Sequence, residues 1–181
     1  MQLIVDGKFK RDRWQAINEL ASVPEKPSVV AYAPEVATLL DNLSASGSLE
    51  TLGVSISPDV DHSILRGLVS RVGLLAIDFP DRLDGRGFSL GVLCRRWGFT
   101  GELRAVGSFI PDQYLHLKGS GFDSVSVPTD SVEKHTELEW RKAFLRFPLR
   151  YQAQAAAVNS ILQRRFSSRA ENKEALANPV A

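Results

Sequence analysis

The chain has 181 residues, of which 44% are hydrophobic and 24% are charged, and its formal net charge at pH 7 is +1. This length suits one domain with a substantial core. The nearly balanced charge gives no electrostatic reason to expect binding to nucleic acid or to a membrane surface. The single cysteine, Cys94, excludes an internal disulfide, a Cys-x-x-Cys redox pair and a thiolate cage for zinc or an iron–sulfur cluster.

The sequence contains no recognisable membrane-spanning segment or secretory signal. No run approaches the roughly 18–20 apolar residues that cross a bilayer. The first residues lack the succession of basic, apolar and small residues that marks a secretory signal. A single cysteine suits a reducing compartment, so we expect a cytoplasmic protein.

The N-terminal residues predict a β-hairpin. Two short runs, residues 3–5 and 8–10, flank Asp6-Gly7. Asp-Gly is a strong signal for a two-residue turn, because both central positions need a positive φ. Trp14 follows, and we expect it to pack the hairpin onto the body of the protein.

Five short apolar runs alternate with segments of helical period, and this rhythm predicts an α/β fold. Each unit has the length of a strand plus a returning helix. The runs show little polar alternation, which is typical of strands covered on both faces. We expect a parallel sheet of about five strands after the hairpin, either open as in flavodoxin or curled into part of a barrel. The predicted strands are residues 28–32, 52–56, 74–77, 103–106 and 124–127, and the predicted helices are residues 35–43, 64–72, 90–97, 112–118 and 130–142.

The chain is predicted to divide into two parts. Residues 1–152 would form a single α/β domain with its N-terminal hairpin, and residues 153–181 a C-terminal helix with a disordered tail. The last segments are expected to be extended, helical and disordered, in that order, over residues 143–151, 154–166 and 167–181.

The main candidate site is the turn Asp84-Gly85-Arg86-Gly87-Phe88-Ser89, which lies between a predicted strand and the helix that follows it. Ligands of α/β folds usually bind at such positions. The two glycines would let backbone N–H groups face a ligand, and Ser89 would cap the helix. Arg86 would offer a planar fork of donors to sulfate, phosphate or carboxylate. The turn therefore predicts an anion site or a cofactor-phosphate site.

A purely structural interpretation of this turn is also open. Asp84-Gly85 can make a tight turn while Arg86 pairs with a nearby acid, which could be Asp78, Asp81 or Asp84. The pattern has neither the glycine spacing of a dinucleotide fingerprint nor the end of a P-loop.

Arg104 is a second candidate, because it lies within a predicted strand. Alternation along the strand places Glu102, Arg104 and Val106 on one face. An arginine in an inner strand needs a partner or a cavity. Glu102 or Asp78 could be that partner, or Arg104 could line the same pocket as Arg86.

Asp112 and Gln113 follow Pro111 at the start of a predicted helix. Proline and an acid in the first turn are ordinary helix-starting residues. Because this loop leaves the same edge of the sheet as the Arg86 turn, both side chains could also face a shared ligand.

No other motif identifies a reaction. His62, His116 and His135 are scattered and lack a second ligand at metal-binding spacing, and no Gly-x-Ser-x-Gly elbow is present. Cys94 is expected to be a small buried hydrophobe. The sequence therefore predicts no metal site, assigns no catalytic residue and leaves the cofactor unknown, with no motif for a covalent one.

A set of motifs carries a family resemblance. The motifs are Phe79-Pro80, the Asp84–Ser89 turn, Gly98-Phe99, the run from Gly101 to Gly107, Asp112-Gln113, Gly121-Phe122-Asp123 and Tyr151-Gln152. On these residues the chain resembles the bacterial family of domain of unknown function 934, over most of its length as far as Tyr151. Members of that family tend to be encoded beside the sulfite reductase haemoprotein, so the resemblance implies a role in assimilatory sulfate and sulfite reduction. It implies no catalytic residues.

Three functions are compatible with these observations. The first is an accessory or electron-delivery partner of the sulfite reductase haemoprotein, with a pocket for a small anion or a phosphate-bearing ligand. The second is a self-contained oxidoreductase that binds flavin or nicotinamide by its phosphate. The third is a barrel-type small-molecule enzyme with Asp112 or Glu102 as the acid–base group.

Overall fold

A computed structural model describes residues 1–18, 24–32, 49–81 and 84–145. Within these ranges, no helix has the length and apolar character needed to cross a membrane. The strands are β1 (Gln2–Val5), β2 (Lys8–Lys10), β3 (Gln15–Ile17), β4 (Ser28–Ala31), β5 (Leu49–Ile56), β6 (Val72–Phe79), β7 (Glu102–Gly107) and β8 (Ser124–Val127). The helices are α2 (His62–Val69), α3 (Arg86–Arg96), the 3-10 turn η2 (Pro111–Gln113), α4 (Tyr114–Gly119), α5 (Thr129–Lys134) and α6 (Glu137–Leu145).

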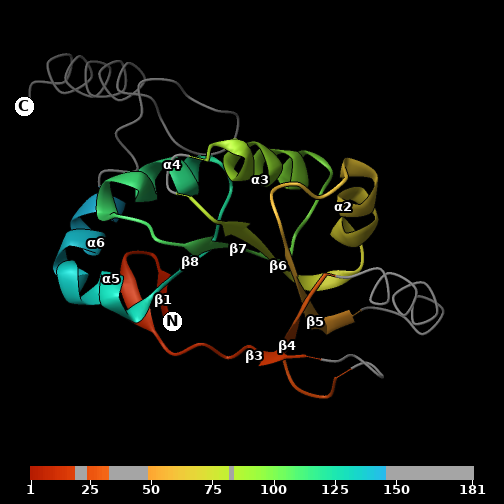
Figure 1. The fold of residues 1–181 in the computed structure, drawn as a ribbon, viewed down its shortest axis with the longest axis horizontal. Helices are drawn as coiled ribbons and strands as arrows, with labels where there is room; N and C mark the ends of the chain where they lie inside the picture. Colours follow the sequence, from red (N-terminus) through yellow and green to blue (C-terminus); the bar gives the residue numbers. More distant parts are fainter. Residues whose placement is uncertain (19–23, 33–48, 82–83, 146–181) are drawn as a thin grey trace, which may run out of the picture. The chain divides into compact units, whose positions relative to one another are not determined.

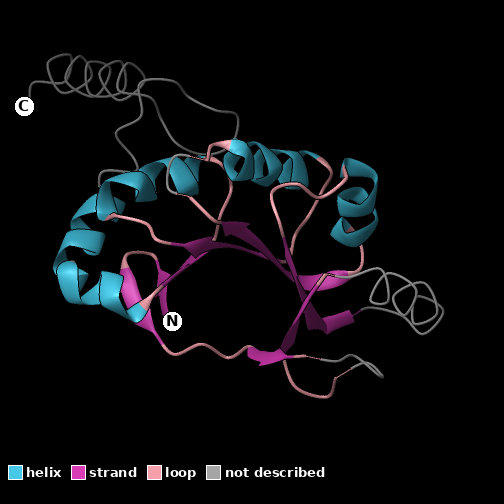
Figure 2. Cartoon of the chain, in the orientation of Figure 1, coloured by secondary structure: helices cyan, strands magenta, loops and turns pink. Residues whose placement is uncertain are grey.

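The described strands form one sheet in the order β2-β1-β8-β7-β6-β5-β4-β3. Neighbours from β3 to β8 run parallel, whereas β1 is antiparallel to both β8 and β2. The sheet curls into a half barrel with the helices on its convex side (Figures 1 and 2). The predicted α/β fold with a mostly parallel sheet is confirmed, and of the two expected forms the curled one is found.

The predicted number of strands, about five, is too small. The sheet has eight described strands, because the hairpin extends it beyond β8 and β3 extends it beyond β4. β3 has only three residues, which is too short to leave a periodic pattern in the sequence. The five predicted strands correspond to β4 through β8.

The N-terminal hairpin is confirmed. Asp6 and Gly7 both have positive φ, 51° and 72°, as a two-residue turn between twisted strands requires. Gly7 also lies directly under α6: a Cβ added there would come within 2.8 Å of the Trp140 carbonyl oxygen. Its N–H donates to the Tyr114 hydroxyl over 3.1 Å. The turn is therefore fixed to the helices by backbone contact that only glycine allows.

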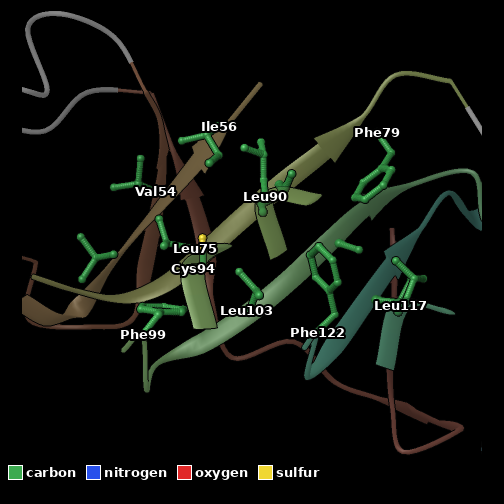
Figure 3. Packing of buried hydrophobic residues seen from close by; sticks show 14 of the residues in the cluster. Val54, Ile56, Leu75, Phe79, Leu90, Cys94, Phe99, Leu103, Leu117 and Phe122 are labelled. Carbon is green, nitrogen blue, oxygen red and sulfur yellow. The ribbon is translucent and has the colours of Figure 1, made fainter. Parts of the chain in front are cut away.

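Most of the core lies between the convex face of the sheet and the helices (Figure 3). Val54, Leu75 and Leu103 come from three adjacent strands, and Leu90 and Cys94 of α3 pack onto them. Burial raises the pKa of the Cys94 thiol to about 11, so this residue is an unreactive hydrophobe, as predicted.

The concave face carries a smaller apolar cluster. Trp14 packs there against Leu74 and Ala76 of β6. The segment that joins β2 to β3 crosses the open side of the half barrel in Figure 1. Trp14 thus fastens the chain that follows the hairpin to the inner face of the sheet, as the sequence suggested.

Several predicted helix boundaries are wrong. α3 begins at Arg86, four residues before the predicted start at Leu90, and α2 ends at Val69 because β6 begins at Val72. The single helix expected over residues 130–142 is two helices, α5 and α6. They separate where the Thr136 N–H donates to the Glu139 carboxylate over 2.7 Å, which is a capping contact for α6.

The C-terminal predictions are tested only in part. α6 continues to Leu145, so the extended segment predicted from Ala143 is wrong for its first three residues. The helices expected at residues 35–43 and 154–166, the tail, and the domain boundary after residue 152 lie outside the described residues. Residues 1–144 form one compact unit.

Candidate functional site

Within the Asp84–Arg86 turn, the arginine is hydrogen-bonded to the aspartate. The Arg86 side chain donates to both oxygens of Asp84, with Nε to Oδ1 at 2.9 Å and Nη2 to Oδ2 at 2.6 Å, and the Arg86 N–H donates to Asp84 Oδ1 over 3.0 Å. Nη1 of the same guanidinium pairs with Asp59, in the loop after β5. These hydrogen bonds from Arg86 lower the pKa of Asp84 to about 2. An anion arriving at this turn would meet a guanidinium that two carboxylates already neutralise.

Gly87 serves helix packing in this structure. A Cβ at Gly87 would lie 2.3 Å from the ring of Phe79, the last residue of β6, so the glycine lets α3 lie directly on the end of that strand. A Cβ at Gly85 would meet nothing within 4 Å.

The prediction that Ser89 caps α3 is wrong. The helix begins at Arg86, its N-cap is Gly85, and the cap makes no side-chain hydrogen bond. Ser89 therefore lies inside the first turn of the helix. The position was misjudged because the sequence period of α3 becomes clear only from Leu90 onward.

Arg104 lies on the concave face of β7 and is 4% exposed. Its guanidinium donates to Asp12 over 2.5 and 3.0 Å and to Glu102 Oε1 over 2.8 Å. Glu102 also accepts hydrogen bonds from the Trp14 indole at 3.0 Å and the Ser124 hydroxyl at 2.7 Å. We call Asp12, Trp14, Glu102, Arg104 and Ser124 the inner-face network.

The inner-face network favours the ionised form of Glu102. Burial acts to raise the pKa of Glu102, but the Ser124 hydrogen bond and the charge of Arg104 outweigh it, and that pKa lies below its ordinary value. Glu102 was one of the two predicted partners of Arg104, and this pairing is confirmed. The second acid, Asp12, comes from a distant segment that sequence reasoning missed.

A cavity of about 470 Å³ adjoins this network at the N-terminal ends of β7 and β8. It is bounded by β1, by the segment that leaves β2, and by the start of β7 and β8. Four cations line it, Lys10, Arg11, Arg13 and Arg104, together with the acids Glu102 and Asp123. We call this space the hairpin cavity.

The charges of the hairpin cavity do not cancel. Glu102 is engaged by Arg104, and Asp123 pairs with Arg95 of α3. Lys10 and Arg11 form no ion pair within the described part of the chain, and Arg13 approaches Glu102 only to 3.9 Å. The cavity therefore presents surplus positive charge, with the planar donors that bind oxyanions.

Asp112 and Gln113 lie elsewhere, in η2 after the C-terminal end of β7. Gln113 Oε1 accepts the Ile110 N–H over 3.2 Å, so this amide helps to hold the turn. Asp112 is exposed. Of the predicted site residues, the structure joins Asp84 to Arg86 and keeps Asp112 and Gln113 at the same C-terminal edge of the sheet as that turn, as expected. Arg104 instead lines the hairpin cavity at the N-terminal ends of the strands, so the alternative that it shares a pocket with Arg86 is wrong.

A half-buried carboxylate, Asp78, lies on the concave face near the C-terminal end of β6. Desolvation raises its pKa, and a hydrogen bond from the Ser55 hydroxyl at 3.2 Å only partly offsets this. The folded state therefore holds the Asp78 proton more tightly than the unfolded state does. As pH rises through the folded pKa, the ionised group costs stability.

Asp78→Asn is accordingly expected to raise the Tm by a few degrees at pH 7. The gain should shrink as pH falls from the raised folded pKa of Asp78 towards the ordinary value of an aspartate, and it should be gone below that value, because the wild-type carboxyl is then protonated in both the folded and the unfolded state. Thermal melts of both proteins between pH 3 and pH 7 test this. Glu133→Gln, at an exposed position of α5, is the control and should show no such trend. A destabilised Asp78→Asn protein at pH 7 would contradict the expectation.

Sequence reasoning missed most of the hairpin cavity. Its signal was the basic run Lys10-Arg11-Asp12-Arg13 directly before a buried tryptophan. Within the described residues, no group of three or more His, Cys, Asp or Glu side chains is arranged to hold a metal ion.

The fold and the site together define an α/β half-barrel protein with a basic cavity beside its N-terminal hairpin. The chain belongs to the family described as bacterial protein of unknown function (DUF934), whose model matches residues 53–162, more than half of the sequence. The matched region includes the glycine turn and Arg104, and the hairpin and the basic run precede it. No curated protein and no solved structure matches the chain.

Proposed function

We propose that this protein acts in assimilatory sulfite reduction as an accessory partner of the sulfite reductase haemoprotein, and that it binds a small oxyanion in the hairpin cavity. The resemblance to the family supports the process, because its members tend to be encoded beside that haemoprotein. The surplus positive charge of the cavity supports the ligand class, and it is the observation on which the binding proposal depends.

The hairpin cavity is a better anion site than the glycine turn. Lys10, Arg11 and Arg13 face a space that a ligand can enter, whereas Arg86 is held by Asp59 and Asp84. Arg104 also lines the cavity, but its charge is already paired with Asp12 and Glu102. It would therefore help to shape the site and would attract the ligand less than Lys10, Arg11 and Arg13 do. An oxyanion would replace solvent around the three surface cations.

Ligand-dependent stability tests the site. Sulfite, sulfate or phosphate should raise the Tm of the wild type relative to chloride at equal ionic strength. The stabilisation amounts to about 2.7 kcal/mol when the free ligand is about 100 times its Kd. The double variant Arg11→Ala, Arg13→Ala should lose most of this effect. Arg96→Ala, an exposed arginine of α3 outside the cavity, should retain it.

The same experiment separates the cavity from the turn. Arg86→Ala should respond to the anions as the wild type does. If Arg86→Ala abolishes the response and the cavity variant keeps it, the anion site is at the Asp84–Ser89 turn and the cavity proposal is wrong.

The partner is tested by gentle purification of the tagged protein from its native host, followed by mass spectrometry. Stoichiometric sulfite reductase haemoprotein in the eluate is the expected result. Its absence from a lysate that contains it, together with no binding between the two purified proteins, would reject the accessory role.

An oxidoreductase with a phosphate-bearing cofactor is a second candidate, and the size of the site favours it. A further cavity of about 620 Å³ adjoins the hairpin cavity, and both are bounded by Arg13 and by residues 100–102. Together they offer more room than sulfite needs. Titration with FMN and with NADPH, followed by calorimetry, distinguishes this role: submicromolar binding that Arg13→Ala weakens would favour it.

A further inference from the structure

A second polar cavity lies at the other edge of the parallel sheet, where β6, β7 and β8 end. Its volume is about 380 Å³. Pro80 and Asp81 after β6, residues 108–110 after β7, and Asp130, Lys134 and His135 of the α5 region line it. The carboxyl ends of adjacent parallel strands are where α/β folds most often bind small molecules. We call this space the strand-end cavity.

The order of the strands defines its floor and walls. Because β7 lies between β6 and β8, the loop after β7 forms the middle. Phe109 in that loop is 2% exposed and packs edge-to-face on Phe79, with ring centroids 4.9 Å apart. The Phe109 N–H donates to the Gly107 carbonyl over 3.1 Å. This floor is apolar and already fixed, as a preformed ligand site requires.

The α5 wall offers both signs of charge to the cavity. Asp130 and Lys134 are four residues apart and so lie on one face of the helix. Within the described residues they form no ion pair with each other or with another side chain. Asp81 adds a carboxylate from the β6 side. An acid and a base that share a cavity without pairing can each receive the opposite charge of one ligand.

We propose that the strand-end cavity binds a free α-amino acid. Asp130 would receive the ammonium group, Lys134 the carboxylate, and the ring of Phe109 the side chain. The volume suits a ligand of this size. This inference is independent of the anion proposal, because the two cavities lie at opposite ends of the parallel strands and share no residue.

Calorimetry of the full chain at pH 7 with each proteinogenic amino acid tests the proposal. At least one should bind, and butylamine and butyrate, which carry one charge each, should bind at least about tenfold more weakly. Lys134→Met and Asp130→Asn should each weaken binding about tenfold or more, as expected for a lost charge-assisted hydrogen bond. Lys142→Met, at an exposed position on α6, is the matched control and should bind as the wild type does.

Three outcomes would overturn the proposal. They are no binding of any amino acid, binding of butyrate as tight as that of the amino acid, and unchanged affinity in a folded Lys134→Met protein. Circular dichroism establishes that each variant is folded. The Arg11→Ala, Arg13→Ala protein should still bind the amino acid, so a failure of the anion site leaves this test intact.

Discussion

Replacing Arg104 with methionine is expected to lower the free energy of unfolding by about 3 kcal/mol, because removing one partner of a buried ion pair leaves the others uncompensated. Asp12 and Glu102 would face the concave side of the sheet without their cation. Urea unfolding followed by tryptophan fluorescence and circular dichroism measures the loss. Arg96→Met, at an exposed position, is the control and should change stability by less than about 0.5 kcal/mol.

A double-mutant cycle makes this expectation sharper. Asp12→Asn and Arg104→Met should together cost clearly less than the sum of the single changes, because they remove the same contact. Strict additivity, or an Arg104→Met loss no larger than that of Arg96→Met, would mean that the inner-face network does not hold the 11–14 segment to β7.

Gly87→Ala is expected to destabilise the protein by about 2 kcal/mol, as overpacking in a filled core does. The new methyl group would meet the Phe79 ring, which cannot move away freely because Phe88, Phe109 and Phe122 pack around it. The higher helix propensity of alanine recovers at most about 1 kcal/mol of this cost.

Gly85→Ala provides the matched comparison two residues away. Apart from Gly85 itself and its two chain neighbours, nothing is found within 4 Å of the added Cβ, and φ at Gly85 is −77°, so alanine fits without strain. This variant should be as stable as the wild type or slightly more stable. Urea midpoints of the two variants measure the difference. Equal losses would show that the turn, and not the contact of α3 with β6, requires the glycines.

The secondary structure was predictable where its signals are local. The Asp6-Gly7 turn and the five apolar runs depend on neighbouring residues, and both predictions are confirmed. The number of strands was not predictable, because the place of β1 beside β8 depends on pairing between the two ends of the unit. β3 was missed because three residues carry too little pattern.

In the candidate site, too, the features with local sequence signals were predictable and those that depend on distant residues were not. That Arg104 needs a partner follows from its place in a strand, and Glu102, two residues away, is that partner. Asp12 is 92 residues away in sequence, and no local pattern connects it to Arg104. The hairpin cavity was missed for the same reason, since its cations and its β7 wall come together only in the folded chain. The pairing of Arg86 with Asp84 was one of the two interpretations that the sequence left open.

The pairing of β1 with β8 has a consequence for the order in which the protein is made. Gln2 lies opposite Val127, so β1, the first described strand, joins the sheet beside β8, the last described strand. The hairpin can form early, because its turn is local, but it must wait for β8 before it has a neighbour. Contacts of such long range slow folding. Shortening the N-terminus would therefore bare the edge of β8 and remove a wall of the hairpin cavity in the same step.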